Sequence, residues 1–317
     1  MPAESVSVVI PVYNSSVILP RLMERLEPVL SKCWTDFEVI LVDDDSHDES
    51  WETIRALAAE RPWMRGIHLM RNYGQHNALL CGIRQAKGVV VVTMDDDLQH
   101  PPEEIPRLVA KLADGFDVVY GSPRHEQHGF WRDIASRMTK IALQSAMGAE
   151  TARRVSPFRA FRRQLRDAFA SYQSQFVSID VLLTWASSRF TAVEVRHDPR
   201  YTGESQYSFR KLVVHALNML TGFSVVPLQL ASLMGFAFTL FGVGLLCYVL
   251  GRYLLDRSVS VPGFPFLASV IVIFSGAQFF ALGIIGEYLA RMHSRTMDRP
   301  AYTVRATTLD ESSDPPA

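Results

Sequence analysis

The chain has 317 residues, of which 48% are hydrophobic and 21% are charged, and it carries 32 Lys and Arg against 33 Asp and Glu. This composition is typical of a globular protein with one or two domains, and it excludes a disordered chain, a collagen and a small disulfide scaffold. A net charge of -1 offers no excess of cations to a phosphate backbone, so we expect no nucleic-acid partner.

Short β-branched runs alternate with helical patterns in the N-terminal part of the chain. Strands are predicted at residues 6–10, 38–42, 66–70, 89–94 and 118–121, and helices at residues 17–30, 49–60, 75–86 and 102–114. This alternation predicts an α/β fold with a mostly parallel sheet and helices on both faces. Ligands of such sheets bind beyond the carboxyl ends of the strands.

Carboxylates follow two of the predicted strands. The acidic run 43–45 follows the second strand and the run 95–97 follows the fourth, whereas the sequence has no glycine-rich dinucleotide or P-loop motif. A carboxylate and a diphosphate repel each other unless a cation lies between them, and oxygen ligands suit Mg²⁺ or Mn²⁺. Asp95 and Asp97 are two residues apart, so their side chains project to the same side as the strand ends. We therefore expect both to face one ion while Asp96 faces elsewhere.

The alternative interpretation of each acidic cluster is a solvated turn that caps the next helix. That interpretation suits Ser46 and Asp48. For Asp44 we favour contact with a nucleotide, and for Asp95 and Asp97 we favour metal binding.

Two C-terminal stretches carry no Asp, Glu, Lys or Arg, namely residues 212–251 and 258–286. A spanning helix needs about 20 apolar residues, so we predict transmembrane helices at residues 228–250 and 266–289. Two buried helices of a large soluble core are the alternative, but such helices usually show a polar stripe. Residues 209–223, basic at first and then apolar, predict an interfacial helix before the first span.

Basic residues flank the predicted spans, and cytoplasmic loops are enriched in Lys and Arg. They are Arg200, Arg210 and Lys211 before the first span, Arg291, Arg295, Arg299 and Arg305 after the second, and Arg252 and Arg257 between the two. We therefore expect both termini in the cytoplasm and a short hairpin loop outside. We expect no signal peptide, a reducing compartment for the three scattered cysteines, and a disordered segment after Leu309.

Several motifs occur in an order that is typical of one enzyme family. They are Val8-Val9-Ile10-Pro11-Val12-Tyr13-Asn14, Val42-Asp43-Asp44-Asp45-Ser46, Arg71-Asn72-Tyr73-Gly74-Gln75-His76, Asp95-Asp96-Asp97-Leu98-Gln99-His100, Ser156-Pro157-Phe158-Arg159, Gly203-Glu204-Ser205-Gln206-Tyr207-Ser208, Gly286-Glu287-Tyr288-Leu289 and Arg299-Pro300-Ala301-Tyr302. Over about residues 5–305 this set resembles the family 2 glycosyltransferases of the GT-A fold. More narrowly, it resembles the branch that makes polyprenyl-phosphate sugars, namely dolichol-phosphate mannose synthases, bactoprenol glucosyltransferases and undecaprenyl-phosphate aminoarabinose transferases.

The resemblance implies a GT-A Rossmann-like domain that binds a nucleotide-sugar donor and a divalent metal, Mg²⁺ or Mn²⁺. Implied donor contacts are Pro11, Tyr13, Val42, Asp44, Asp95, Asp96, Arg124 and Arg200, implied metal ligands are Asp95, Asp97 and Gln99, and implied neighbours of the acceptor phosphate are Arg124, Ser156 and Arg159. Asp97 is the main catalytic candidate, while Asp180 either orients the sugar or is a helix-capping or structural carboxylate. Three residues depart from the family pattern: Asp45 where Gly is usual, His100 where Asp is common, and Gln206 where Lys is typical.

We therefore predict a cytoplasmic GT-A catalytic domain at residues 1–207, a juxtamembrane amphipathic segment at 208–226, a two-helix transmembrane hairpin at 227–290 and a cytoplasmic C-terminal tail at 291–317. The expected reaction is the inverting transfer of a sugar from a nucleotide-diphosphate sugar, such as a UDP-sugar, to a polyprenyl phosphate such as undecaprenyl phosphate at the inner membrane. Its product would serve the modification of cell-envelope glycans. The sequence does not give the oligomeric state; some members of the branch are tetramers, so a homo-oligomer stays open as an alternative to a monomer.

Two alternatives to this function stay open. One is an inactive membrane scaffold on a transferase fold, against which the intact Asp95, Asp97 and Gln99 speak. The other is a processive polysaccharide synthase, but the sequence lacks the Gln-x-x-Arg-Trp motif and the further spans that are usual in such enzymes.

Overall fold

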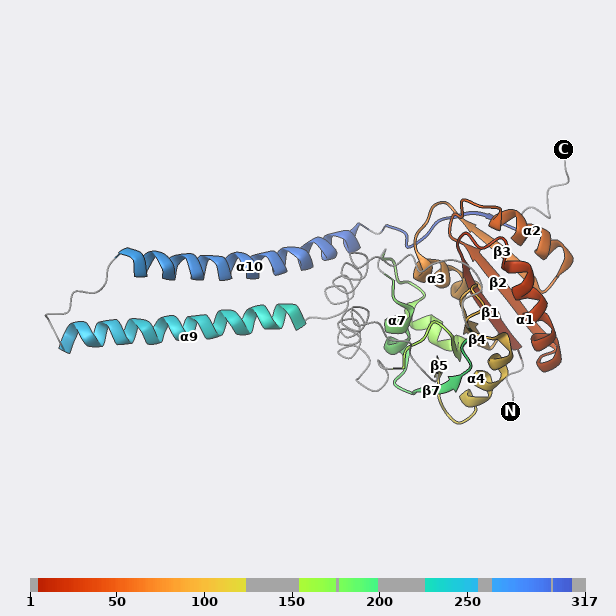
Figure 1. Ribbon diagram of the computed structural model, residues 1–317, viewed down its shortest axis with the longest axis horizontal. Coiled ribbons are helices and arrows are strands. Elements are labelled where there is room, and N and C mark those ends of the chain that lie inside the picture. Colours follow the sequence, from red (N-terminus) through yellow and green to blue (C-terminus); the bar gives the residue numbers. More distant parts are fainter. Residues whose placement is uncertain are drawn as a thin grey trace.

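A central sheet of eight strands organises the α/β domain of the molecule (Figure 1). The computed structural model describes residues 5–123, 154–174, 177–198, 226–255, 264–297 and 299–309. The strands lie in the order β7-β5-β6-β4-β1-β2-β3-β8. Their bounds are β1 Ser5–Val12, β2 Asp36–Asp43, β3 Met64–Leu69, β4 Val90–Thr93, β5 Val118–Pro123, β6 Arg159–Arg162, β7 Phe190–Val195 and β8 Val304–Thr307.

Most neighbouring strands run parallel, as the sequence predicts. β1 pairs in parallel with β2 and β4, β2 with β3, and β5 with β7. The antiparallel strands are β6, which lies between β4 and β5, and β8, which lies on the outer side of β3. Because the parallel strands end at one edge of the sheet, the turns that follow β1, β2 and β4 meet there.

Helices cover both faces of the sheet, and the strand sequences alternate accordingly. In β1, Val8 and Ile10 point into the core on one face, whereas Val9 points into the core on the other. The first face is covered by α1 (Leu19–Cys33), α2 (Ser50–Glu60) and α4 (Ile105–Leu112), which follows the short 3₁₀ turn η1 (Pro102–Glu104). The second face is covered by α3 (Gln75–Gln85), α7 (Ile179–Ala186) and the 3₁₀ segment η2 (Arg163–Phe169).

The segment after α10 returns to the sheet, contrary to the prediction of a tail at residues 291–317. Residues Val304–Thr307 form β8 and pair with β3 through Ile67 opposite Thr307 and His68 opposite Ala306. The part of this segment that the structure describes is therefore an edge strand of the α/β domain. The expected disordered segment after Leu309 lies outside the described residues.

Two long helices, α9 (Val226–Leu255) and α10 (Phe264–Thr296), run side by side away from the α/β domain (Figure 1). The rings of Phe238 and Phe274 meet between them, with centroids 5.7 Å apart. Among the described residues, one stretch is long and apolar enough to cross a bilayer: Ile273–His293 in α10, with a mean hydropathy of 1.4 and no buried residues. The apolar stretch of α9, Leu228–Gly244, is shorter. One of the two predicted spans thus has a candidate helix in the structure, and the prediction of two is not confirmed.

Candidate functional site

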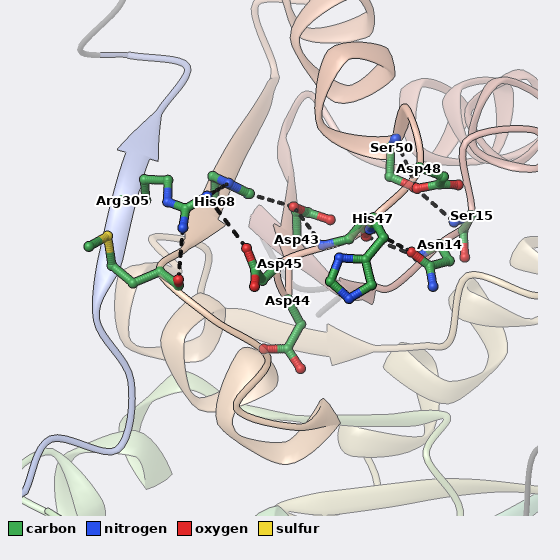
Figure 2. A network of polar contacts seen from close by, with 12 residues as sticks. Asn14, Ser15, Asp43, Asp44, Asp45, His47, Asp48, Ser50, His68 and Arg305 are labelled. Carbon is green, nitrogen blue, oxygen red and sulfur yellow. Dashed lines mark hydrogen bonds and ion pairs between the residues drawn. The ribbon is translucent and has the colours of Figure 1, made fainter.

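The turns that follow β1 and β2 are joined by hydrogen bonds between their backbones and side chains. The amide of Asn14 donates to Ser46 Oγ over 2.9 Å, and the amide of His47 donates to Asn14 Oδ1 over 2.8 Å. The amide of Ser15 donates to Ser50 Oγ over 2.8 Å. These bonds hold the two turns in one arrangement at the carboxyl edge of the sheet (Figure 2).

The predicted donor contacts on β1 and β2 differ in their accessibility. Pro11 and Val42 are buried and lie opposite each other in the register of the two strands. The Tyr13 side chain is exposed at the edge and meets the His47 ring in an edge-on contact, with centroids 6.1 Å apart. An exposed ring at this edge is a suitable partner for a nucleobase, and the donor role of all three residues stays a prediction.

Asp43 and Asp44 point in different directions at the end of β2 (Figure 2). The carboxylate of Asp44 accepts hydrogen bonds from the amides of Tyr73 and Gly74, each over 2.7 Å. Burial raises the pKa of Asp44, and the two amides act in the opposite direction. Gly74 has φ of 93°, in the region that favours glycine, and it directly precedes α3. Asp44 thus fixes the segment before α3, and its contact with a nucleotide stays a prediction.

The Arg71–His76 segment connects three parts of the site. Besides its bonds to Asp44, it places Gln75 Nε2 2.5 Å from Asp95 Oδ1. His76 Nδ1 accepts a hydrogen bond from the amide of Ile179, at the start of α7, over 3.4 Å. In the sequence this segment indicates only a resemblance to a family, and no local pattern predicts that Gln75 holds Asp95.

The acidic run at residues 95–97 lies in a turn after β4, and not at the end of the strand as predicted. β4 ends at Thr93, so the alternation of a strand does not govern Asp95 and Asp97. The expected difference from Asp96 is nevertheless present, because Asp96 accepts hydrogen bonds from the amide of Tyr13 and the hydroxyl of Ser15. Burial raises the pKa of Asp96 to about 6, and these hydrogen bonds act in the opposite direction.

Asp95 and Asp97 are partly exposed and offer carboxylate oxygens to a cation. The backbone N–H of Gln99 donates to Asp97 Oδ1 over 3.1 Å. This bond closes the turn around Leu98, whose φ is 59°. No group of three or more His, Cys, Asp or Glu in the described part of the chain is arranged to hold a metal. Mg²⁺ is usually held by only one or two carboxylates together with substrate phosphates, so this pair of carboxylates fits such an ion.

His100 joins this turn to two other segments. Its ring stacks on Phe158 with centroids 5.3 Å apart and meets His197 edge-on at 5.2 Å. Burial, and then the neighbouring His197, lower the pKa of His100 to about 4, so the ring is neutral near pH 7. The Asp198 amide also donates to the Gln99 carbonyl over 2.9 Å. The turn after β4 is thereby fixed against the segments at residues 156–159 and 197–198.

Arg159 and Asp180 form a buried ion pair beneath the site. Arg159 is only 1% exposed, and its guanidinium bonds to Asp180 Oδ1 and, over 3.0 Å, to Thr93 Oγ1. The Tyr120 hydroxyl also donates to Asp180 Oδ1 over 3.2 Å, and burial raises the pKa of Tyr120. The positions of Thr93 and Tyr120 follow from the register, since both lie opposite Arg159 in neighbouring strands.

This geometry favours the structural interpretation of Asp180 over a contact with the sugar. Ser156 is also buried, and its Oγ accepts a hydrogen bond from the Phe158 amide over 3.2 Å. The proximity of Ser156 and Arg159 to an acceptor phosphate stays a prediction. Arg124 and Arg200, the other predicted phosphate contacts, lie outside the described residues.

The comparisons with known proteins agree with this architecture. The model of the family described as glycosyl transferase family 2 matches residues 7–169, about half of the chain. The chain belongs to glycosyltransferase family 2. The match extends from β1 to η2 and so includes the turns after β1, β2 and β4.

Curated relatives within this glycosyltransferase family match nearly the whole chain. An undecaprenyl-phosphate 4-deoxy-4-formamido-L-arabinose transferase from Pseudomonas savastanoi pv. phaseolicola is 38% identical over 316 residues, covering 98% of this chain and 93% of the relative. A transferase of the same name from Aeromonas hydrophila is 37% identical over 303 residues, covering 94% and 92%. The crystal structure of mannosyl-3-phosphoglycerate synthase from Rubrobacter xylanophilus has a TM-score of 0.50 at 16% identity, covering 68% of this chain and 72% of that one. This likeness confirms the fold.

Replacement of Asp44 tests its role in holding the segment before α3. Asp44→Asn is expected to lower the free energy of unfolding by about 1 to 3 kcal/mol, because the amide keeps one acceptor oxygen for two backbone N–H groups. Thermal or denaturant unfolding of the purified protein measures the change. Asp36→Asn, at the exposed first residue of β2, is the control, and its free energy of unfolding should stay within about 0.5 kcal/mol of that of the parent protein. Equal stability of the two variants would show that the two amide bonds contribute little.

Proposed function

We propose that this family 2 glycosyltransferase moves a sugar from a nucleotide-diphosphate sugar, of the UDP-sugar class, to a polyprenyl phosphate such as undecaprenyl phosphate. The observation that carries the proposal is the similarity to transferases named for that acceptor, at 36 to 38% identity over 94 to 98% of the chain. These matches include the C-terminal helices as well as the α/β domain. The product would be a polyprenyl-monophosphate sugar for modification of cell-envelope glycans.

The chemistry of the proposed reaction needs little acid or base catalysis. A lipid phosphate is already ionised near neutral pH, so it is a nucleophile without a strong general base. The protein has to align a phosphate oxygen with the anomeric carbon, and an in-line displacement inverts that carbon. Asp95 and Asp97, with Gln99, would hold Mg²⁺ or Mn²⁺, which would neutralise charge on the departing diphosphate. Gln75 and the Gln99 amide orient the two carboxylates for this task.

The proposed location is the cytoplasmic face of the inner membrane. A polyprenyl chain stays in the bilayer, so an enzyme that uses it has to work at the membrane surface. The exposed apolar side chains of α10, including Phe279, Leu282 and Ile285, suit lipid contact. A hairpin of α9 and α10 with both chain ends in the cytoplasm agrees with the basic residues around it.

A panel of donors offered to undecaprenyl phosphate tests this proposal. Washed membranes that contain the protein are incubated with undecaprenyl phosphate and nucleotide-activated glucose, galactose, mannose, N-acetylated sugars or 4-deoxy-4-formamido-L-arabinose. The mass of the lipid product is then measured by mass spectrometry. We expect one donor to give a lipid-monophosphate sugar, and chelation of divalent metal to stop the reaction. Membranes with the Asp97→Asn variant are the matched control. If no donor yields a glycolipid while the protein still binds the lipid, the scaffold alternative is correct.

A further inference from the structure

Arg305 of β8 reaches over the edge of the sheet to the turn that follows β2 (Figure 2). Its Nη1 lies 3.1 Å from His68 Nε2 and 3.5 Å from Asp45 Oδ1. Its Nη2 donates to the carbonyl of Met70 over 2.9 Å. One guanidinium thus contacts β3, the loop after β3 and the turn after β2.

Arg305 and Asp43 contact opposite nitrogens of the His68 ring. A guanidinium offers only donors, so His68 Nε2 has to accept. His68 Nδ1 then carries the ring proton and donates to Asp43 Oδ2 over 2.6 Å. Trp51 stacks on the same ring with centroids 5.0 Å apart, which fixes its plane. Arg305 and Asp43 therefore favour the same tautomer, and Arg305 holds the ring in place against Asp43.

Asp43 passes this constraint to the turns of the candidate donor site. Its side chain is fully buried, and Oδ2 also accepts from the Ser46 amide over 3.4 Å. Ser46 in turn accepts the hydrogen bond from the amide of Asn14 described above. The chain of contacts thus runs from β8 through β3 to the turns after β1 and β2.

The backbone of the turn after β2 gives a second reason for a contact at this place. Asp45 stands where the family usually has Gly, and its φ is 58°, in the left-handed region. An L-residue is disfavoured there relative to glycine. Asp45 forms the ion pair with Arg305, and this pair stabilises the strained turn.

We propose that Arg305 is a positioning residue for the nucleotide donor, acting through His68, Asp43 and Asp45. This proposal rests on the proposed function, because it assumes that the turns after β1 and β2 hold the donor. The strand that follows the long helices is on this view a part of the donor site. Arg305 does not touch the reacting atoms, and its effect is on donor affinity.

The test compares Arg305→Met with the parent protein, both full length and purified in detergent. We expect the affinity for UDP with Mg²⁺, measured by calorimetry, to fall about tenfold, which corresponds to about 1.4 kcal/mol. The donor KM should rise by the same factor, while kcat and the acceptor KM stay within about twofold. Hydrogen exchange at residues 43–48 should become faster without ligand, and exchange in β4 should not change. Arg305→Lys, which keeps the charge but loses the fork of donors, should recover part of the affinity.

Arg299→Met removes an exposed cation from the same returning segment and is the matched control, with no expected change. Unchanged exchange at residues 43–48, unchanged UDP affinity, or an equal loss of kcat and acceptor affinity in Arg305→Met would each overturn the positioning role. A parent protein that binds UDP but never glycosylates undecaprenyl phosphate would overturn the proposed function alone. If the parent binds none of UDP, GDP and CDP, both proposals fail.

Discussion

Asp97→Asn is expected to lower sugar transfer by at least about a thousandfold. An amide carries no charge, so the variant leaves one carboxylate, Asp95, for a cation that neutralises a diphosphate. Metal coordination contributes several kcal/mol of charge stabilisation in such reactions, and each 1.4 kcal/mol is a factor of ten in rate. Transfer to the lipid and binding of Mn²⁺, the latter by electron paramagnetic resonance, are to be measured on the same preparation.

Asp167→Asn is the matched control for this experiment, because the Asp167 side chain is 79% exposed and lies on η2. It should keep full activity and full Mn²⁺ binding. Full activity of Asp97→Asn would show that the metal assignment is wrong. A loss of activity with unchanged Mn²⁺ binding would instead assign Asp97 a role that is independent of the ion.

The second large effect is expected from Asp180→Asn, which removes the charge opposite Arg159 in the protein interior. An uncompensated buried charge costs about 3 to 5 kcal/mol of folding stability. The free energy of unfolding in denaturant measures this loss. Asp114→Asn, at an exposed pair with Lys111, should cost less than about 1 kcal/mol.

A double variant separates a structural role of Asp180 from a chemical one. Arg159→Met together with Asp180→Leu removes both charges, and it should be more stable than Asp180→Asn because no charge stays unpaired. If Asp180→Asn unfolds like the parent protein but has lost activity, Asp180 acts on the substrate, and the structural interpretation is wrong.

The sequence was sufficient to predict the parallel core of the fold. The strands at residues 5–12, 36–43, 64–69, 90–93 and 118–123 lie where β-branched runs indicate them. β6 was missed because its four residues include two arginines, one of which is buried by an ion pair that no local pattern reveals. β8 was missed because four residues, Val304–Thr307, are too few for a periodic signal.

The candidate site, like the fold, could be predicted only in part from the sequence. Residues that follow a strand, such as Asp44 and Asp95, could be placed from the sequence because parallel strands end at one edge. The partners of Asp43 could not, since His68 lies opposite it only through the register of β2 and β3. Arg305 was counted among the cations that orient membrane helices, although its guanidinium is engaged at the sheet edge.

The position of β8 also limits how the chain is threaded through a bilayer. β7 and β8 belong to the same sheet, so the chain leaves the α/β domain after β7 and rejoins it at β8 on one side of the membrane. A path that starts and ends on the same side crosses the bilayer an even number of times. Of the helices that the structure describes between β7 and β8, α9 is the candidate for the second crossing if α10 spans the membrane; otherwise both helices stay on the side of the sheet. Accessibility of a single labelled site in the 256–263 connection, measured from each side of sealed vesicles, distinguishes these two arrangements.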